Sequence, residues 1–222
     1  MNLQEVDRVE ILTLQDNYVD LVARDDNEIV KRAVPYKEQR FEISVSAEHG
    51  FSALVTVFLG DRARSVLFDF GFSENGAAQN AKALNLDLTS VEALVLSHGH
   101  MDHIGGLLAL VELTGKKGLD LFLHPAAFRQ PRYMKTVAGI NVILPSLSRH
   151  QIQTSGIMIR EAKAPTTFLD GQLLFLGEVP RKTEFEKGAP YFFHEEEGQE
   201  HLDLLEDDTA LVANIRGRGL MV

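Results

Sequence analysis

The sequence has 222 residues, no cysteine and a formal net charge of −10 at pH 7. One domain with a sizeable core is expected at this length. The lack of cysteine excludes disulfides, thiolate zinc sites and cysteine nucleophiles, and the acidic balance argues against a nucleic-acid-binding face.

The first eight residues are polar and acidic, with neither a basic n-region nor an apolar h-region. A signal peptide is therefore not expected. No apolar run approaches the roughly 20 residues that a membrane span needs. A cytoplasmic protein with no membrane partner is the simplest interpretation.

Four strand-type segments are expected in the first third of the chain: Arg8 to Leu14, Phe41 to Ser46, Ala53 to Leu59 and Arg64 to Phe70. Residues 24–40 are charged and contain Pro35, which predicts an exposed loop. The alanine-rich segment Asn75 to Leu84 predicts a helix.

The segment Ser97 to Gly106, with the sequence SHGHMDHIGG, holds three of the eight histidines and one carboxylate. It follows a strand-type run, Val91 to Leu96, and precedes Leu107 to Leu113, which has apolar residues at helical spacing. Gly115 is a plausible end for that helix. The segment is therefore expected on a strand-to-helix loop.

In a locally extended loop, His98 and His100 point the same way because side chains alternate with a period of two. Two imidazoles on one side can hold one metal ion, while Asp102 and His103 are placed for a second. Imidazole nitrogen and carboxylate oxygen suit zinc, iron and manganese. Asp102 is also a good helix N-cap, and the two roles do not exclude each other.

Two further residues of interest lie at the ends of expected strands. Asp69, before Gly71, is either a turn residue or a buried carboxylate that orients a metal-ligating histidine. His124 follows Leu119 to Leu123 and either lines the site or belongs to a plain loop.

The later chain contains one basic and one acidic segment. Residues 128–135 either meet an anionic substrate group or form a solvated loop. The acidic run from His194 to Asp208 predicts a surface loop with His194 and His201 exposed. Further strands are expected over Ile140 to Leu144, Gly156 to Glu161, Gln172 to Leu176, Thr209 to Ile215 and Arg218 to Val222.

The histidine segment resembles the signature loop of the metallo-β-lactamase superfamily, and Val66 to Gly71 resembles its earlier strand ending in Asp-x-Gly. Three more stretches, Ala47 to Ser52, Gly177 to Glu186 and Asp207 to Val212, narrow the match. They are similar to a branch that includes an archaeal pterin-pathway synthase acting on a dihydropterin and a ribofuranosyl-aminobenzene phosphate. The resemblance covers nearly all of this chain but only the earlier part of a family member.

The resemblance implies an α/β fold, namely a four-layer αββα sandwich of two mixed sheets packed face to face with helices outside. It implies a hydrolase-type enzyme that uses a metal-activated water, with zinc as the cofactor and iron or manganese as other options. A pterin or another phosphorylated, anionic small molecule is the implied substrate.

The same resemblance assigns roles to residues. His98 and His100 would hold the first ion, and Asp102 and His103 the second, with Asp102 also the catalytic residue. Asp69 would orient a ligand histidine. We add His49 and His124 as residues that line the site.

Two other function classes remain open: an oxidative enzyme with non-haem iron at the same ligands, and a catalytically incomplete fragment or subunit. The chain ends in an apolar run, Leu220 to Val222, where the family continues into a segment with another ligand histidine. We therefore expect a single domain over residues 1–222, incomplete at its C-terminus. Its unpaired sheet edge would favour self-association.

Overall fold

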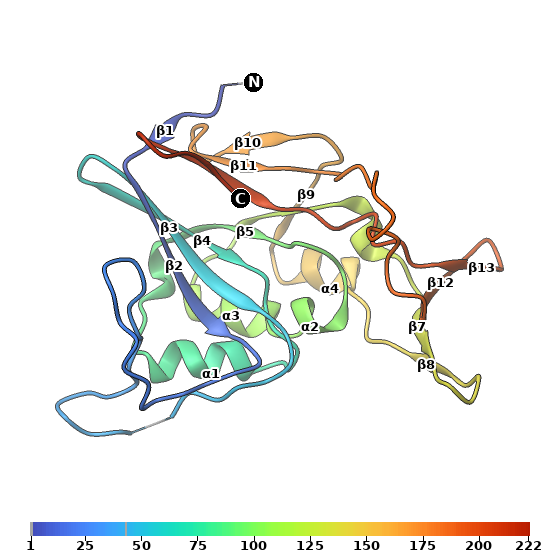
Figure 1. Cartoon of the computed structure of the whole chain (residues 1–222), viewed down its shortest axis with the longest axis horizontal. Coiled ribbons are helices and arrows are strands. Elements are labelled where there is room, and N and C mark those ends of the chain that lie inside the picture. The colour runs from blue at the N-terminus through green and yellow to red at the C-terminus, as the bar shows by residue number, and fades with distance from the viewer. Residues whose placement is uncertain (1, 43) are drawn as a thin grey trace.

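The computed structural model describes residues 2–42 and 44–222. Its centre is a mixed six-stranded sheet in the order β2-β3-β4-β5-β6-β9 (Figure 1). The strands β2 to β4 pair antiparallel, and β4, β5, β6 and β9 pair parallel. Their bounds are Arg8–Gln15 (β2), Ser52–Leu59 (β3), Arg62–Phe68 (β4), Val91–Val95 (β5), Asp120–Leu123 (β6) and Met158–Glu161 (β9).

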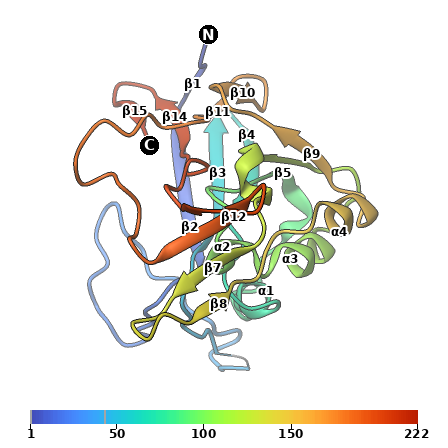
Figure 2. The same cartoon turned by 90° about the vertical axis from the view of Figure 1, so that its right-hand side faces the viewer.

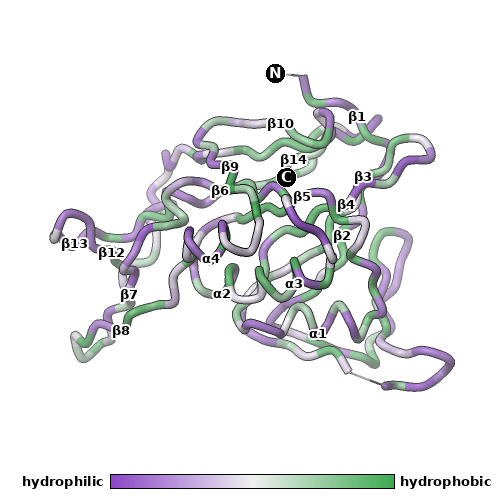
Figure 3. The backbone as a smooth tube through the Cα atoms, turned by 180° about the vertical axis from the view of Figure 1, so that it is seen from behind, coloured by the Kyte–Doolittle hydropathy of each residue, from purple (hydrophilic) through white to green (hydrophobic). Residues whose placement is uncertain are grey.

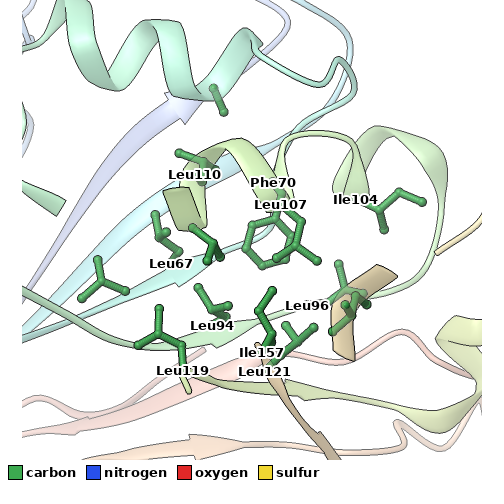
Figure 4. Packing of buried hydrophobic residues seen from close by; sticks show 14 of the residues in the cluster. Leu67, Phe70, Leu94, Leu96, Ile104, Leu107, Leu110, Leu119, Leu121 and Ile157 are labelled. Carbon is green, nitrogen blue, oxygen red and sulfur yellow. The ribbon is translucent and has the colours of Figure 1, made fainter. Parts of the chain in front are cut away.

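The α-helices cover one face of this sheet (Figure 1). Each of them contributes side chains to a core shared with β4, β5 and β6. Figure 4 shows Leu107 and Leu110 packed over Leu67 and Leu94 in this core. The helices are Gly76–Ala83 (α1), Met101–Ile104 (α2), Leu107–Thr114 (α3) and Arg149–Thr154 (α4), and two short 3-10 turns are Leu88–Ser90 (η1) and Pro125–Phe128 (η2).

A second, five-stranded sheet packs on the opposite face. It has the order β1-β14-β11-β10, with β15 added beside β14. These strands are Glu5–Val6 (β1), Thr166–Phe168 (β10), Leu173–Phe175 (β11), Leu211–Ile215 (β14) and Gly219–Met221 (β15). The chain therefore forms an α/β sandwich, as expected.

The sequence of β5 shows why the six-stranded sheet is covered on both of its faces. Leu94 lies in the core under the helices, whereas Ala93 and Val95 lie in the core between the sheets. Successive side chains of a strand point to opposite faces, so a parallel strand covered on both faces is a continuous apolar run. Within the described residues, every α-helix contributes to the first core and none to the second. Three of the four layers implied by the family resemblance are thus present there.

A third, four-stranded sheet lies beside the sandwich (Figures 1 and 2). It has the order β13-β12-β7-β8, and Figure 3 shows that β12 and β13 are largely hydrophilic. Its strands are Arg132–Lys135 (β7), Asn141–Ile143 (β8), Phe192–Glu196 (β12) and Gln199–Leu202 (β13).

This sheet corrects two predictions. Residues 132–135 form β7 rather than a solvated loop, and Arg132 is buried. The acidic run from His194 is not a surface loop either, because most of it belongs to the β12–β13 hairpin. His194 packs inward and is buried, while His201 is exposed as expected.

Most other predicted elements are present within two or three residues of their expected bounds. Gly115 ends α3 in the left-handed conformation, as predicted. The strand expected over Phe41 to Ser46 includes Ile43, which lies outside the described residues, and its described neighbours form no strand. Across residues 2–42 and 44–222, no helix has the length and apolar character to cross a membrane.

Candidate metal centre

The histidine motif lies at the carboxyl ends of parallel strands β4 and β5. Asp69 follows β4 directly and adopts a left-handed backbone conformation with φ of 56°. It is buried, and its Oδ1 accepts a hydrogen bond from the backbone N–H of Ser97 at 2.7 Å. This bond ties the end of β4 to the start of the motif. Ligand sites of open α/β sheets form outside this edge.

The turn after the histidines packs closely on the loop that follows Asp69. Gly105 donates its backbone N–H to Gly71 O at 2.8 Å. A Cβ at position 105 would lie 1.8 Å from Phe72 O, so no larger residue fits there. The close approach brings α2 against the strand ends and places Asp102 and His103 beside the preceding histidines.

Asp69 fixes the orientation of two imidazoles. Its Oδ2 accepts from His103 Nδ1 and from Ser97 Oγ, each at 2.7 Å. Because a hydroxyl has only one hydrogen, Ser97 Oγ accepts at its 3.0 Å contact with His98 Nδ1. In the neutral form of each of these imidazoles the hydrogen is therefore on Nδ1, which leaves the Nε2 lone pair for a metal ion.

His100 has the opposite tautomer. Its Nε2 lies 3.0 Å from Asp203 Oδ2, a carboxylate oxygen that accepts the ring N–H. The lone pair is therefore on Nδ1. Asp203 is buried and lies just beyond β13, so the acidic hairpin that the sequence placed on the surface positions a motif histidine.

A buried arginine holds the acidic segment in place. Arg132 Nε lies 3.0 Å from Asp203 Oδ2, and its second guanidinium branch donates to Asp207 Oδ2 at 2.8 Å. Asp207 also accepts the backbone N–H of Gly99 at 2.8 Å. Burial by itself raises the pKa of each aspartate. For Asp203, the hydrogen bond from His100 and the charge of Arg132 outweigh burial. For Asp207, Arg132 with the Gly99 N–H outweighs it, so both pKa values are below the ordinary range.

The ligand atoms of His98, His100 and Asp102 all lie within 4.8 Å of one another. Imidazole nitrogens and a carboxylate oxygen are the donors that zinc, iron and manganese accept. Each imidazole also has a hydrogen-bond partner at its other nitrogen, as metal-ligating histidines usually do. The residues therefore fit a divalent cation.

The motif has an uneven charge distribution. Burial and the nearby His103 and His100 lower the pKa of His98 to about 3. Burial also lowers the pKa of His103, but Asp102 and Asp69 outweigh it and raise the pKa to about 9. The carboxylates therefore favour positive charge beside Asp102, whereas His98 stays neutral.

The remaining predicted site residues are placed differently. His49 reaches Asp102, with Nε2 3.4 Å from Oδ2. His124 is buried, and its Nδ1 accepts the N–H of Ala126 and so caps η2, while its Nε2 lies 3.8 Å from Glu178.

The basic stretch 128–135 does not present free cations. Arg129 pairs with Glu206, Lys135 with Glu200, and Arg132 with the two buried aspartates. Its charges are already matched by the acidic segment, so it offers little attraction to an anionic substrate.

Sequence reasoning missed Arg132, Asp203 and Asp207. The available signal was the coincidence of one locally basic stretch with one acidic run in the same chain. Oppositely charged segments can pair, but neither one shows by itself which of its residues becomes buried.

Comparison with known proteins agrees with this geometry. The sequence profile described as the metallo-beta-lactamase superfamily matches residues 49–119. This segment belongs to the metallo-β-lactamase superfamily. It contains the four residues of the histidine motif that were predicted as ligands, together with Asp69 and His49.

Two proteins of Methanocaldococcus jannaschii are similar in sequence. One is named 7,8-dihydropterin-6-methyl-4-(β-D-ribofuranosyl)-aminobenzene-5'-phosphate synthase and is 26% identical over all of this chain and 69% of its own length. The other, an uncharacterized protein, is 28% identical over 75% of this chain and 60% of its own length. The chain thus spans between three-fifths and seven-tenths of the length of these relatives.

A solved structure shares the fold. It is Tm1679, described as a metal-dependent hydrolase of the β-lactamase superfamily, with a TM-score of 0.62 and 24% identity. The match covers 93% of this chain and 62% of that one. The arrangement of mixed sheets and few helices is therefore that of this structure.

Proposed function

We propose that this chain carries the metal centre of a hydrolase-type enzyme. Its proposed substrate is a pterin or another phosphorylated small molecule. The observation that carries the proposal is the convergence of His98, His100 and Asp102, each within 4.8 Å of the others. A partly buried group of this kind without a ligand would gather charge and lone pairs at an energetic cost.

The chain's own residues supply binding and orientation. His98 Nε2, His100 Nδ1 and Asp102 are the atoms we assign to the cation, which when bound acts as a Lewis acid and lowers the pKa of a water to about 7. Asp69 holds His98 in the tautomer that this binding needs through the Ser97 hydroxyl, and Asp203 does so for His100 directly. Asp102 is partly exposed and is the carboxylate that we assign to proton transfer with the substrate or water.

The chemical class of the substrate comes from two supports. The similar synthase is named for a pterin joined to a ribofuranosyl-aminobenzene phosphate. In addition, a cavity of about 430 Å³ lies beside His98 and His103, with apolar walls that include Phe51, Phe68 and Leu211. Sites of that size and character commonly hold aromatic small molecules.

Metal analysis tests the proposal first. Protein purified without added metal should contain zinc, iron or manganese, and a variant with His98→Ala and His100→Ala should lose most of it. A matched control, His150→Ala with His201→Ala, removes two exposed histidines and should retain the metal. Equal metal content in all three proteins would overturn the assignment.

The substrate class is tested by calorimetric titration with a phosphorylated pterin, with inorganic phosphate as the comparison. Saturable binding of the pterin that requires the metal supports the proposal, and no binding contradicts it. Iron as the native metal, with consumption of oxygen on addition of the pterin, would instead favour an oxidative enzyme at the same ligands.

A further inference from the structure

The four-stranded sheet beside the sandwich has two edges that differ in charge. At one edge, β13 carries Glu200 and follows the acidic residues Glu195 to Glu197. At the other edge, β8 has the sequence Asn-Val-Ile, without a charged residue. Figure 3 shows the same contrast, with β8 hydrophobic and β13 hydrophilic. Proteins commonly protect a free sheet edge with charged side chains, so the β13 edge is protected and the β8 edge is not.

The β7–β8 hairpin exposes apolar side chains to solvent. Ile143 is 72% exposed and Val142 is 42% exposed, and Val137 and Ile140 in the connecting turn are exposed as well. Figure 1 shows that the hairpin projects away from the sandwich. Neighbouring exposed apolar residues mark places where another molecule binds.

This apolar hairpin belongs to an uncharged segment. Residues from Thr136 to Ser148 carry no charge, although 24% of the chain is charged and its net charge is −10. A comparable uncharged segment, Phe51 to Gly60, contains the largely buried strand β3. A strongly basic or acidic partner would find no opposite charge on the hairpin turn or on β8. Two copies of an acidic chain repel each other least where both are neutral, so the charge pattern favours a second copy as the partner.

The pairing of β8 with β7 determines which backbone groups face outward. Leu144 donates its N–H to Arg132 O at 2.9 Å. In an antiparallel pair, successive residues alternate between facing the neighbouring strand and facing away from it. Val142 therefore also faces β7, whereas Asn141 and Ile143 present their N–H and C=O groups at the outer edge. Within residues 2–42 and 44–222, β7 is the only strand that pairs with β8.

The outer edge of β8 is complementary to a second copy of itself. When two β8 strands lie antiparallel about a two-fold axis at Val142, Asn141 of each copy is opposite Ile143 of the other. Both residues face outward, so each opposed pair exchanges two N–H···O hydrogen bonds. The two Val142 side chains are then directly opposite and in contact. Pro145, the next outward-facing residue, has no N–H, so the pairing ends before it.

We infer that β8 is the interface of a homodimer, in which two copies of this chain pair antiparallel along Asn141–Ile143 and join their four-stranded sheets into one. The inference is independent of the proposed function, because it uses no residue of the histidine motif. Since β8 has only three residues, the interface is small, and the dimer should dissociate on dilution.

Sedimentation equilibrium of the full 222-residue chain tests the inference. The unmodified protein should show a reversible monomer–dimer equilibrium as its concentration is varied. Ile143→Lys places a charge on the edge and Ile143→Pro removes an outward-facing N–H, so each should weaken dimerisation by at least about tenfold. The matched control is Met158→Lys, which adds the same charge at an exposed apolar residue of another edge strand, β9, and should leave dimerisation unchanged.

Single cysteine substitutions test the register, because the chain has no cysteine of its own. Val142→Cys places two thiols opposite each other at the two-fold axis, where a disulfide can join them. Mild oxidation should therefore give a covalent dimer. In Asn141→Cys the two thiols are diagonal rather than opposite, so cross-linking should be at least about tenfold slower. A mixture of Asn141→Cys with Ile143→Cys should instead form covalent heterodimers.

Circular dichroism should show that all variants are folded. An unmodified protein that is monomeric at every concentration would overturn the inference, as would unchanged dimerisation in Ile143→Lys and Ile143→Pro. Loss of the dimer in Leu220→Lys but not in Ile143→Lys would also overturn it, because the interface would then lie at β15. Faster cross-linking of Asn141→Cys than of Val142→Cys would contradict the pairing about Val142.

Discussion

The metal centre joins two regions that are built in different ways. One is the strand-end region, Asp69 and residues 97–103, where the contacts of Asp69 span 28 and 34 residues of the chain. The other is the hairpin region, Arg132, Asp203 and Asp207, which reaches the motif through contacts that span 103 and 108 residues. The first region provides the atoms that we propose as metal ligands, and the second orients one of them, His100.

The difference shows how charge is used in each region. In the strand-end region, the Asp69 carboxylate accepts hydrogen bonds from one backbone N–H, one hydroxyl and one imidazole. In the hairpin region, two carboxylates are buried against one guanidinium. Buried ions of that kind depend on every partner being present, so the two regions should fail differently when mutated.

The largest effect is expected in the strand-end region. The double substitution His98→Ala and His100→Ala should remove most of the bound metal, because it deletes two of the three grouped ligands. Elemental analysis measures this directly. The fold should be kept, as judged by circular dichroism, because both residues lie on a loop and not in either core. Retention of full metal content would show that the ligands lie elsewhere.

The hairpin region should instead fail through stability. Arg132→Met leaves Asp203 and Asp207 buried without their cation, which typically costs about 3–5 kcal/mol of unfolding free energy. Urea unfolding should show the loss. Arg160→Met is the control, because Arg160 pairs with Asp120 at the surface and its removal should cost less than about 1 kcal/mol. Similar losses in the two variants would mean that the buried network contributes little.

The strand-end region should also give the metal-free protein a stability maximum near pH 6.5. The pKa of His103 is raised to about 9, so its contribution is complete below the unfolded value of 6.5 and is lost as the pH rises to about 9. The pKa of His98 is lowered to about 3, so stability is lost as the pH falls below 6.5. Each contribution is about 3–5 kcal/mol.

Unfolding measured with a chelator present, from about pH 5 to about pH 9, checks this. A free energy of unfolding that rises steadily across that range would contradict the assignment of His103. Repeating the series with Asp69→Asn should reduce the loss on the alkaline side, because His103 then has one carboxylate fewer to favour its charged form.

The smallest effects should come from the orienting carboxylates. Asp69→Asn and Asp203→Asn each remove a partner of an imidazole, which usually weakens metal binding by about 10- to 100-fold. We expect the larger loss for Asp69, because it fixes His103 directly and His98 through Ser97. Competitive titration against a chelator measures the ratio. Asp120→Asn serves as the control, because Asp120 is a surface carboxylate away from the motif. A larger loss of metal affinity in Asp203→Asn than in Asp69→Asn would contradict the expected order.

Much of the sandwich could be predicted because its strands are distinctive locally. Val91 to Leu96 is a continuous apolar run, and burial on both faces requires such a sequence. The four candidate ligands of the motif could be proposed because all of them lie within six residues. Asp69 could also be placed, since the strand that precedes it ends at the same sheet edge.

Asp203 and Asp207 could not be placed for the opposite reason. They stand in a run of acids, and such runs are usually solvated. The partners of Asp207 lie far away in the sequence, Arg132 by 75 residues and the Gly99 N–H by 108 residues, and no local pattern indicates that pairing. His194 was misplaced for the same reason, because its acidic neighbours suggested exposure although its own side chain packs inward.

The distance along the chain between His100 and Asp203 has a consequence during synthesis. At about 5–20 residues per second, the 103 residues between them take roughly 5–20 s to be made. Throughout that interval the nascent His100 ring lacks the carboxylate that selects its tautomer, although Asp69 is already available to His98 and His103. The carboxylate that orients His98 and His103 is therefore synthesised before the histidine motif, whereas the carboxylate that orients His100 is synthesised 103 residues after that histidine.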